Sequence, residues 1–274
     1  MMHSHTKFTN LLFLKLGGSL ITDKSRPHTV HFQVLARLAN EIHTAMKHNP
    51  DLHLVLGHGS GSFGHVPAKK FGTRQGVRTE TGWQGFVEVW REAGALNHHV
   101  TRALSESGLL SISMPPSGSV IADDGEISSW DLSPLTSALE VGLLPVIYGD
   151  VVFDKIRGGT ILSTEDLFTY MANKLTPSRI LLAGREPGVW SDYPESKILL
   201  TDISAHNVAQ ISPFLEGSSN TDVTGGMASK VQQSLDLVKK TPALEISIFS
   251  GETPGAVQRA LLGAHEGTTI HDRD

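Results

Sequence analysis

The segment Leu11-Leu12-Phe13-Leu14-Lys15-Leu16-Gly17-Gly18-Ser19-Leu20 combines an apolar strand pattern with one lysine and two adjacent glycines. Burying a lysine is costly unless an anion meets it. Paired glycines allow backbone N–H groups to approach a ligand that a Cβ would keep away. This junction is therefore suited to phosphate oxygens, bound by amides and a fixed positive charge. Lys24, a little further along the chain, offers a second cation near the same turn.

Strand-like apolar runs alternate with helical patterns, which predicts an α/β protein with a mostly parallel sheet. The expected strands are Leu11–Leu16, Leu52–Leu56, Leu110–Met114, Leu144–Tyr148, Arg179–Ala183 and Glu245–Phe249. The expected helices are Phe32–Lys47, Trp83–Ser107, Asp166–Lys174, Ala205–Phe214, Gly226–Lys239 and Pro254–Leu262. Val151–Asp154 and Thr160–Leu162 flank a glycine pair and are expected to form a β-hairpin. The best boundary within a single fold unit falls after Asp150, between an N-terminal lobe (1–150) and a C-terminal lobe (151–274).

Composition excludes several classes of protein. The 274 residues are 39% hydrophobic and 19% charged, as in an ordinary globular protein. The formal net charge of −5 argues against a nucleic-acid partner, and no apolar run approaches the ~20 residues of a membrane span. The absence of cysteine excludes disulfides and thiolate chemistry and fits a cytoplasmic location.

A second glycine-rich segment follows the expected strand Leu52–Leu56. Gly59, Gly61 and Gly64 match the dinucleotide-binding spacing G-x-G-x-x-G, so a Rossmann dehydrogenase is one interpretation, and a simple tight turn is another. However, the segment follows the second strand instead of opening the domain. Two glycine loops, each after a strand, favour a site that holds two phosphorylated ligands.

Two polar residues next to these segments are candidates for the site. His65 lies where a helix could begin, and its imidazole could donate a hydrogen bond to a phosphate, although a lone histidine is more often a surface residue. Asp150 follows the strand Leu144–Tyr148 and could hold Lys15 and Lys24 by charge-assisted hydrogen bonds, or it could be a solvated turn residue.

The segment Asp222–Lys230 contains a third glycine pair. Thr224 could cap a helix that begins near Gly226, and the glycines would expose its first amides. Lys230, one turn further on, could then reach a terminal phosphate of a nucleotide. The alternative is a lysine on a solvated helix face.

An aromatic stripe runs along the expected helix Trp83–Ser107. Trp83, Phe86, Val87 and Trp90 follow the spacing i, i+3, i+4, i+7. Such stripes normally pack into the core. If this one is partly exposed, it could instead bind the hydrocarbon tail of a substrate.

Together these residues resemble the amino-acid-kinase superfamily and, within it, the isopentenyl phosphate kinases. The matching segments are Lys15–Ser19 with Thr22–Lys24, Gly59–His65, Tyr148–Asp150, Ser163–Asp166 and Asp222–Lys230. Lys-x-Gly-Gly-Ser marks only the superfamily, whereas Gly-Ser-Phe-Gly-His is a narrower signal. One segment departs from the family: 183–190 replaces a Thr-Asp-Val-Asp-Gly-like stretch.

The resemblance implies a three-layer αβα sandwich with an open, mostly parallel sheet, usually a homodimer. It implies transfer of the γ-phosphoryl group of ATP to isopentenyl phosphate, giving isopentenyl diphosphate. Mg²⁺ would travel with ATP, with no metal site of the protein's own. The N-terminal lobe would bind the acceptor phosphate and the C-terminal lobe the nucleotide.

Matching positions carry the expected roles. The expected catalytic residues are Lys15, Lys24, His65 and Asp150. The expected nucleotide-binding residues are Lys15, Gly17, Gly18, Ser19, Gly61, Gly184, Thr224, Gly225, Gly226 and Lys230. The expected substrate-binding residues are Ser60, Gly61, His65, Gly149, Trp83, Phe86 and Trp90.

Three other functions remain open at this stage. A kinase for a small phosphonate such as fosfomycin would use much the same lysines and histidine. Family members that act on carboxylates would not need His65. A nucleotide-binding regulator without turnover would keep the glycine loops but could dispense with Lys24.

Overall fold

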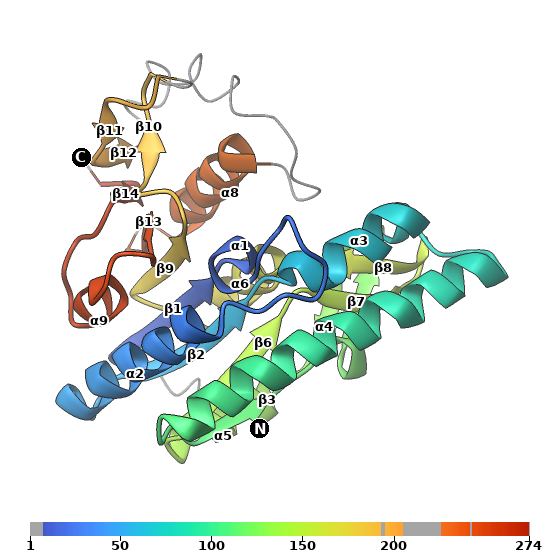
Figure 1. Cartoon of the computed structure of the whole chain (residues 1–274), viewed down its shortest axis with the longest axis horizontal. Coiled ribbons are helices and arrows are strands. Elements are labelled where there is room, and N and C mark those ends of the chain that lie inside the picture. Colours follow the sequence, from blue (N-terminus) through green and yellow to red (C-terminus); the bar gives the residue numbers. More distant parts are fainter. Residues whose placement is uncertain (1–7, 193–194, 205–225, 242, 274) are drawn as a thin grey trace.

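The computed structural model describes residues 8–192, 195–204, 226–241 and 243–273 (Figure 1). Within these ranges the main sheet consists of eight strands: β1 (Leu11–Leu16), β2 (His53–His58), β3 (Ser111–Ser113), β6 (Leu144–Tyr148), β9 (Arg179–Gly184), β12 (Asp202–Ser204), β13 (Glu245–Ser250) and β14 (Thr268–His271). Their order is β12-β14-β13-β9-β1-β2-β6-β3. All of these pairs are parallel except β13 with β14, so the expected mostly parallel sheet is confirmed.

Helices cover both faces of this sheet. One face carries α2 (Phe32–His48), α4 (Glu80–Glu106) and α9 (Ala256–Leu261), and the other carries α5 (Ser133–Glu140), α6 (Thr164–Leu175) and α8 (Gly226–Lys240). The alternation along β1 creates the two cores: Leu12, Leu14 and Leu16 pack with the first group of helices, while Leu11 and Phe13 pack with the second. The predicted αβα sandwich is therefore confirmed.

Smaller elements complete the described structure. A four-stranded sheet has the order β5-β4-β7-β8, formed by β4 (Val120–Asp123), β5 (Glu126–Trp130), β7 (Asp150–Asp154) and β8 (Gly158–Leu162). The remaining elements are α1 (Gly18–Ile21), α3 (Gly61–Phe71), the 3₁₀ turns η1 (Thr73–Gln75) and η2 (Pro116–Gly118), and the pair β10 (Val189–Trp190) and β11 (Leu199–Leu200). Among the described helices, none is long and apolar enough to cross a membrane.

The six expected strands are all present, and their ends differ by one or two residues at most. The expected hairpin is confirmed, because β7 and β8 pair antiparallel. The expected helix Ala205–Phe214 lies outside the described residues. One expectation was wrong: helix α3 begins at Gly61, so His65 lies within the helix instead of at its start.

The boundary expected after Asp150 divides the main sheet into two contiguous halves. Strands β3, β6, β2 and β1 come before it in the chain, and β9, β13, β14 and β12 come after it. The halves meet where β1 pairs with β9, in parallel, over Leu12 to Leu16. The segments that follow β1 and β9 therefore emerge side by side at the junction.

The loops after β1 and β2 pack backbone against backbone. A Cβ on Gly18 would lie 2.4 Å from the backbone N of Gly61, and one on Gly59 would lie 2.9 Å from the backbone N of Gly18. The Thr22 hydroxyl locks the contact, because it donates to the Gly18 carbonyl (2.7 Å) and accepts from the Ser62 N–H (2.9 Å). These glycines therefore serve a close approach of two loops, in addition to any ligand.

Gly18→Ala should lower the free energy of unfolding by about 1–3 kcal/mol, because the new methyl group meets rigid backbone. Gly94 provides a control of opposite sign, since a Cβ there has nothing within 4 Å and the residue lies inside α4. Gly94→Ala should raise the free energy of unfolding by about 0.5–1 kcal/mol. Urea unfolding measures both, and an equal effect of the two variants would contradict the packing of the loops.

Candidate functional site

A cavity of about 980 Å³ lies at the carboxyl ends of the central strands. This is where open α/β sheets bind ligands. Eleven residues singled out from the sequence line it: Lys15, Gly17, Gly18, Ser19, Lys24, Ser60, His65, Gly149, Gly184, Gly226 and Lys230. Two segments far apart in the chain thus bring three lysines to one space, Lys15 and Lys24 from the first and Lys230 from the second, as the sequence led us to expect.

Other expected residues lie elsewhere. Gly61, Asp150, Trp83, Phe86 and Trp90 do not line the cavity, and Thr224 and Gly225 lie outside the described residues. Gly61 instead packs beneath the loop after β1, with a φ of +51° that favours glycine. Cavity residues to which the sequence had assigned no role include Ala68, Arg74, Val89, Ile161, Ser163, Thr164, Glu165 and Met227.

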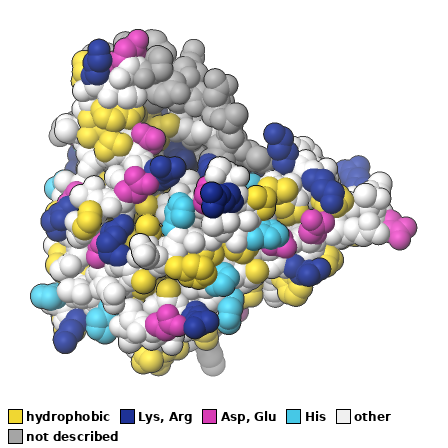
Figure 2. Space-filling model, viewed as in Figure 1, with side chains coloured by type: hydrophobic (Ala, Val, Ile, Leu, Met, Phe, Trp, Pro, Cys, Tyr) yellow, Lys and Arg dark blue, Asp and Glu magenta, His cyan; other side chains and the backbone are white. Residues whose placement is uncertain are grey.

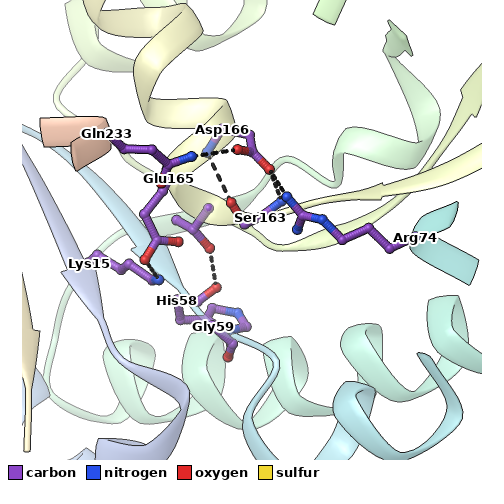
Figure 3. Close-up of polar contacts among 9 residues, drawn as sticks. Lys15, His58, Gly59, Arg74, Ser163, Glu165, Asp166 and Gln233 are labelled. Carbon is purple, nitrogen blue, oxygen red and sulfur yellow. Dashed lines mark hydrogen bonds and ion pairs between the residues drawn. The ribbon is translucent and has the colours of Figure 1, made fainter. Parts of the chain in front are cut away.

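Lys15 forms an ion pair with Glu165 at the floor of the site (Figure 3). The Lys15 Nζ donates to Glu165 Oε1, and the two side chains are only 12% and 13% exposed. Burial by itself would raise the pKa of Glu165. The charge and hydrogen bond of Lys15, with the charge of Lys230, outweigh burial and hold that pKa below its ordinary value. Glu165 therefore stays ionised, paired with Lys15 and under the electrostatic influence of Lys230.

The start of α6 fixes the position of Glu165. The Ser163 hydroxyl accepts from the Asp166 N–H (3.1 Å), and Asp166 Oδ2 accepts from the Ser163 N–H (2.8 Å), which is a capping box. The Thr164 hydroxyl donates to the His58 carbonyl (2.7 Å), which ties the helix to β2. The capping pattern was visible in the sequence, but nothing local indicated that Glu165 would face Lys15.

Asp150 does not hold the lysines, so this expectation was wrong. Its side chain is fully buried at the start of β7, and Oδ1 accepts from the Val151 N–H (2.8 Å). Burial raises the pKa of Asp150 to about 6, against the opposing effect of hydrogen bonds from Ser117 and Val151. The residue turns away from the cavity, and Glu165 takes the place expected of it.

Two backbone amides expected to bind phosphate are already engaged. The Gly17 N–H donates to the Ala183 carbonyl (2.8 Å), and the Gly149 N–H donates to the His58 carbonyl (3.3 Å). Gly18 and Ser19 begin α1, where a helix leaves its first amides without an acceptor of its own. After β1, the amides available for phosphate oxygens are therefore those of Gly18 and Ser19.

Two members of the aromatic stripe, Trp83 and Phe86, pack against Phe153 of β7, and no member of the stripe lines the cavity. Trp83 and Trp90 are 36% and 48% exposed, and Phe86 is buried. The rings of Trp83, Phe86 and Phe153 pack on one another, with centroids 5.2 to 6.1 Å apart. The residue of α4 that reaches the cavity is Val89, which lies one turn beyond Phe86. The stripe predicted from the periodicity is therefore not the buried face of α4, because Val87 is exposed as well, and the helix buries Phe86, Val89 and Ala93 instead.

The segment that departs from the family pattern lines the other end of the cavity. Arg185, Glu186 and Trp190 contribute side chains there. The Trp190 Nε1 donates to Glu186 Oε2 (3.3 Å), and the Arg185 Nε donates to Glu252 Oε1 (2.8 Å). Met227 and Ile248 also line the cavity, so its wall here combines apolar and charged residues.

Residues 10–250 match the amino acid kinase family model, and the chain belongs to this family. Within the family the chain is similar to isopentenyl phosphate kinases. That of Methanocaldococcus jannaschii is 35% identical over 269 residues (95% of this chain, 98% of the relative), and that of Methanothermobacter thermautotrophicus is 35% identical over 272 residues, with the same coverage. An isopentenyl phosphate kinase crystal structure superposes with a TM-score of 0.79 at 31% identity, covering 95% and 100% of the two chains. The Rossmann interpretation of Gly59–Gly64 is therefore wrong.

Glu165→Gln should lower kcat for phosphoryl transfer by about tenfold or more, because Lys15 and Lys230 lose their shared counter-charge and shift. Glu165→Asp keeps the negative charge, so its kcat should fall less than that of Glu165→Gln. Steady-state release of ADP measures both variants. If kcat of Glu165→Gln stayed within twofold of the wild-type value, Glu165 would not orient the lysines.

Asp150→Asn should stabilise the protein at pH 7.5 by about 1–3 kcal/mol. A raised pKa means that the folded state favours the protonated acid. The stabilising contribution of Asp150 to the free energy of unfolding is therefore fully present below about pH 4. It is lost as pH rises through about 6, and a neutral amide avoids that loss. Urea unfolding at pH 5 and pH 7.5 should show a smaller gain at pH 5, and an equal gain at both would argue against the assignment.

Proposed function

We propose that this protein transfers the γ-phosphoryl group of ATP to isopentenyl phosphate, giving isopentenyl diphosphate. One observation carries the proposal: a single cavity contains Lys15, Lys24 and Lys230 together with His65 and an apolar wall. Three lysines suit two polyanionic ligands that must meet, and an apolar wall suits a hydrocarbon tail. The similarity to isopentenyl phosphate kinases over 95% of the chain supports the choice of substrate.

The nucleotide occupies the end of the cavity formed after β9 and at the start of α8. The base packs near Trp190, Met227 and Ile248. The phosphates extend toward the amides of Gly18 and Ser19, with Lys15 and Lys230 beside them. Thr224 and Gly225, just before α8, are part of the same proposal, as are Gly184 and Gly226 on the cavity wall.

The acceptor occupies the end of the cavity formed by α3, α4 and β8. His65 donates a hydrogen bond to its phosphate, next to the backbone at Ser60. The tail lies against Ala68, Val89 and Ile161, behind which Phe86 and Val77 form a small buried cluster. A phosphonate of a few atoms would leave this apolar space unfilled, which favours an alkyl monophosphate as the acceptor.

The chemistry is in-line transfer between two phosphates. The nucleophile is an oxygen of a phosphate monoester, whose second pKa is about 6, so it needs no strong general base at neutral pH. The obstacle is repulsion between two anions. Lys15 and Lys230 neutralise the nucleotide phosphates, and Lys24 stabilises the group in transit. Catalysis is then mostly positioning and charge stabilisation, which requires lysines held in place, as Glu165 holds Lys15.

Mg²⁺ is proposed to enter with ATP. Within the described ranges, no group of three or more histidine or acidic side chains is arranged to hold a metal ion, and Glu165 is engaged by Lys15. This donor set fits a metal bound mainly by phosphate oxygens and water, which would neutralise charge on the phosphates.

We also propose a cytoplasmic homodimer without a nucleic-acid or membrane partner. The net charge is −5, and on the face seen in Figure 2 the Lys and Arg side chains are interspersed with Asp and Glu. Strand β3 ends the order of the main sheet, and Leu110, Ile112 and Val141 are exposed beside it. An apolar sheet edge of this kind is suited to a second copy of the chain.

An ADP-release assay over four acceptors tests the function. Isopentenyl phosphate should give the highest kcat/KM, followed by dimethylallyl phosphate, with little turnover of fosfomycin and none of acetylglutamate. A preference for fosfomycin would replace the proposed substrate with a phosphonate. No turnover of any acceptor, with ATP still bound, would favour a nucleotide-binding regulator.

Two variants should separate the roles of the cations. Lys24→Ala should lower kcat by ~10²-fold or more, because a charge that stabilises the transferring group is lost. His65→Ala should mainly raise KM for the acceptor. Steady-state kinetics with each substrate varied in turn distinguishes the two, and undiminished kcat in Lys24→Ala would reject its role.

A further inference from the structure

We propose that Asp166 is a positioning residue that holds helix α8, and with it Lys230, in register with the acceptor side of the cavity. It acts through Arg74 and Gln233. The inference rests on the proposed function, because the role of Lys230 in binding the nucleotide phosphates is part of that proposal. Its evidence is the geometry at the start of α6 (Figure 3).

Asp166 joins three segments that are far apart in the chain. Its Oδ2 accepts from Arg74 Nη2 (3.2 Å), 92 positions away, and its Oδ1 accepts from Gln233 Nε2 (3.2 Å), 67 positions away. Oδ2 also completes the capping box with Ser163. The side chain is only 20% exposed, so its charge is partly shielded from water. Both carboxylate oxygens thus accept hydrogen bonds from neighbouring elements, Oδ2 from η1 and Oδ1 from α8.

Arg74 belongs to the acceptor side. It lies in η1 just after α3, it lines the cavity, and its carbonyl accepts from the Thr160 hydroxyl (2.9 Å) on β8. Its Nη1 is buried and has no hydrogen-bond partner in the described part of the chain. A buried guanidinium nitrogen is costly without compensation, so the charge of Asp166 matters for keeping Arg74 in this position.

Gln233 belongs to the nucleotide side. It lies three residues after Lys230 on α8, which places the two side chains on neighbouring parts of one helix face. Gln233 does not line the cavity, whereas Lys230 does. A hydrogen bond from Gln233 to Asp166 therefore restrains the rotation and shift of α8 without touching either substrate.

The two adjacent acidic residues at the start of α6 have different roles. Glu165 pairs with Lys15 and interacts electrostatically with Lys230. Asp166 holds α8, which carries Lys230, and Arg74, which lines the acceptor side of the cavity. A misplacement of a reacting group by about 1 Å can cost 10²-fold in rate. Release of α8 should therefore reduce turnover more than it reduces stability.

Gln233→Leu tests the contact on α8, and Gln232→Leu is its matched control. Gln232 is the neighbouring residue, is exposed, and bonds only its own helix neighbour Asp236 (2.9 Å) among the contacts described. Gln233→Leu should lower kcat about tenfold and weaken ATP binding severalfold, with KM for isopentenyl phosphate within twofold of wild type. Gln232→Leu should leave all three values within twofold.

Arg74→Met tests the contact between Arg74 and Asp166, and Arg78→Met is its matched control. Arg78 is exposed and donates to the Ile156 carbonyl (2.8 Å). Because Arg74 and Gln233 act through the same carboxylate, the double variant Arg74→Met/Gln233→Leu should lose no more kcat than the worse single variant. Losses that simply multiply would show two independent effects and overturn the proposal.

ATP affinity, measured by titration calorimetry with no acceptor present, separates this proposal from the proposed function. A wild-type protein that binds ATP but does not phosphorylate isopentenyl phosphate would refute the substrate alone. The ratio of ATP affinities for Gln233→Leu and Gln232→Leu would still decide the positioning role. Equal affinities and equal kcat in these two folded variants would show that Asp166 only caps α6.

Discussion

The ion pair between Lys15 and Glu165 is the constraint on which the site depends. A lysine near the end of the central strand β1 would be costly to bury alone, and Glu165 meets it from the start of α6. The charge of Lys230 also helps to hold the pKa of this carboxyl group below its ordinary value, so one anion interacts electrostatically with two of the three lysines. Both lysines line the same cavity. Removing it would leave Lys15 without the carboxylate that pairs with it.

Backbone packing supplies the second requirement, which is a place where two ligands can meet. The pairing of β1 with β9 brings the two halves of the main sheet together, and the cavity spans this junction. Interlocked glycines at Gly18, Gly59 and Gly61 bring the loops after β1 and β2 closer than any side chain would allow. The loops after β1 and β2 therefore meet backbone to backbone beside the cavity.

Much of the fold could be predicted from local sequence. Strand β1, with its alternation between two cores, and the β7–β8 hairpin followed directly from periodicity and turn residues. The predictions were wrong where they depended on the direction in which a side chain points in the folded protein. Asp150 and Glu165 both follow strands and both could reach a lysine, but β7 turns Asp150 into the interior. Of the stripe predicted through Trp83, only Phe86 is buried, and the residue of this helix that lines the cavity is Val89.

The positions of the strands along the chain, and the lysines that lie beside glycine pairs, could be read from the sequence alone, because hydrophobic period and glycine freedom act over a few residues. Only the tertiary structure decided that Glu165 is the partner of Lys15, and that Asp166 joins Arg74 to Gln233. Those contacts join residues 67 to 150 positions apart. A charge selects its partner by distance and burial in three dimensions, and no local pattern encodes either.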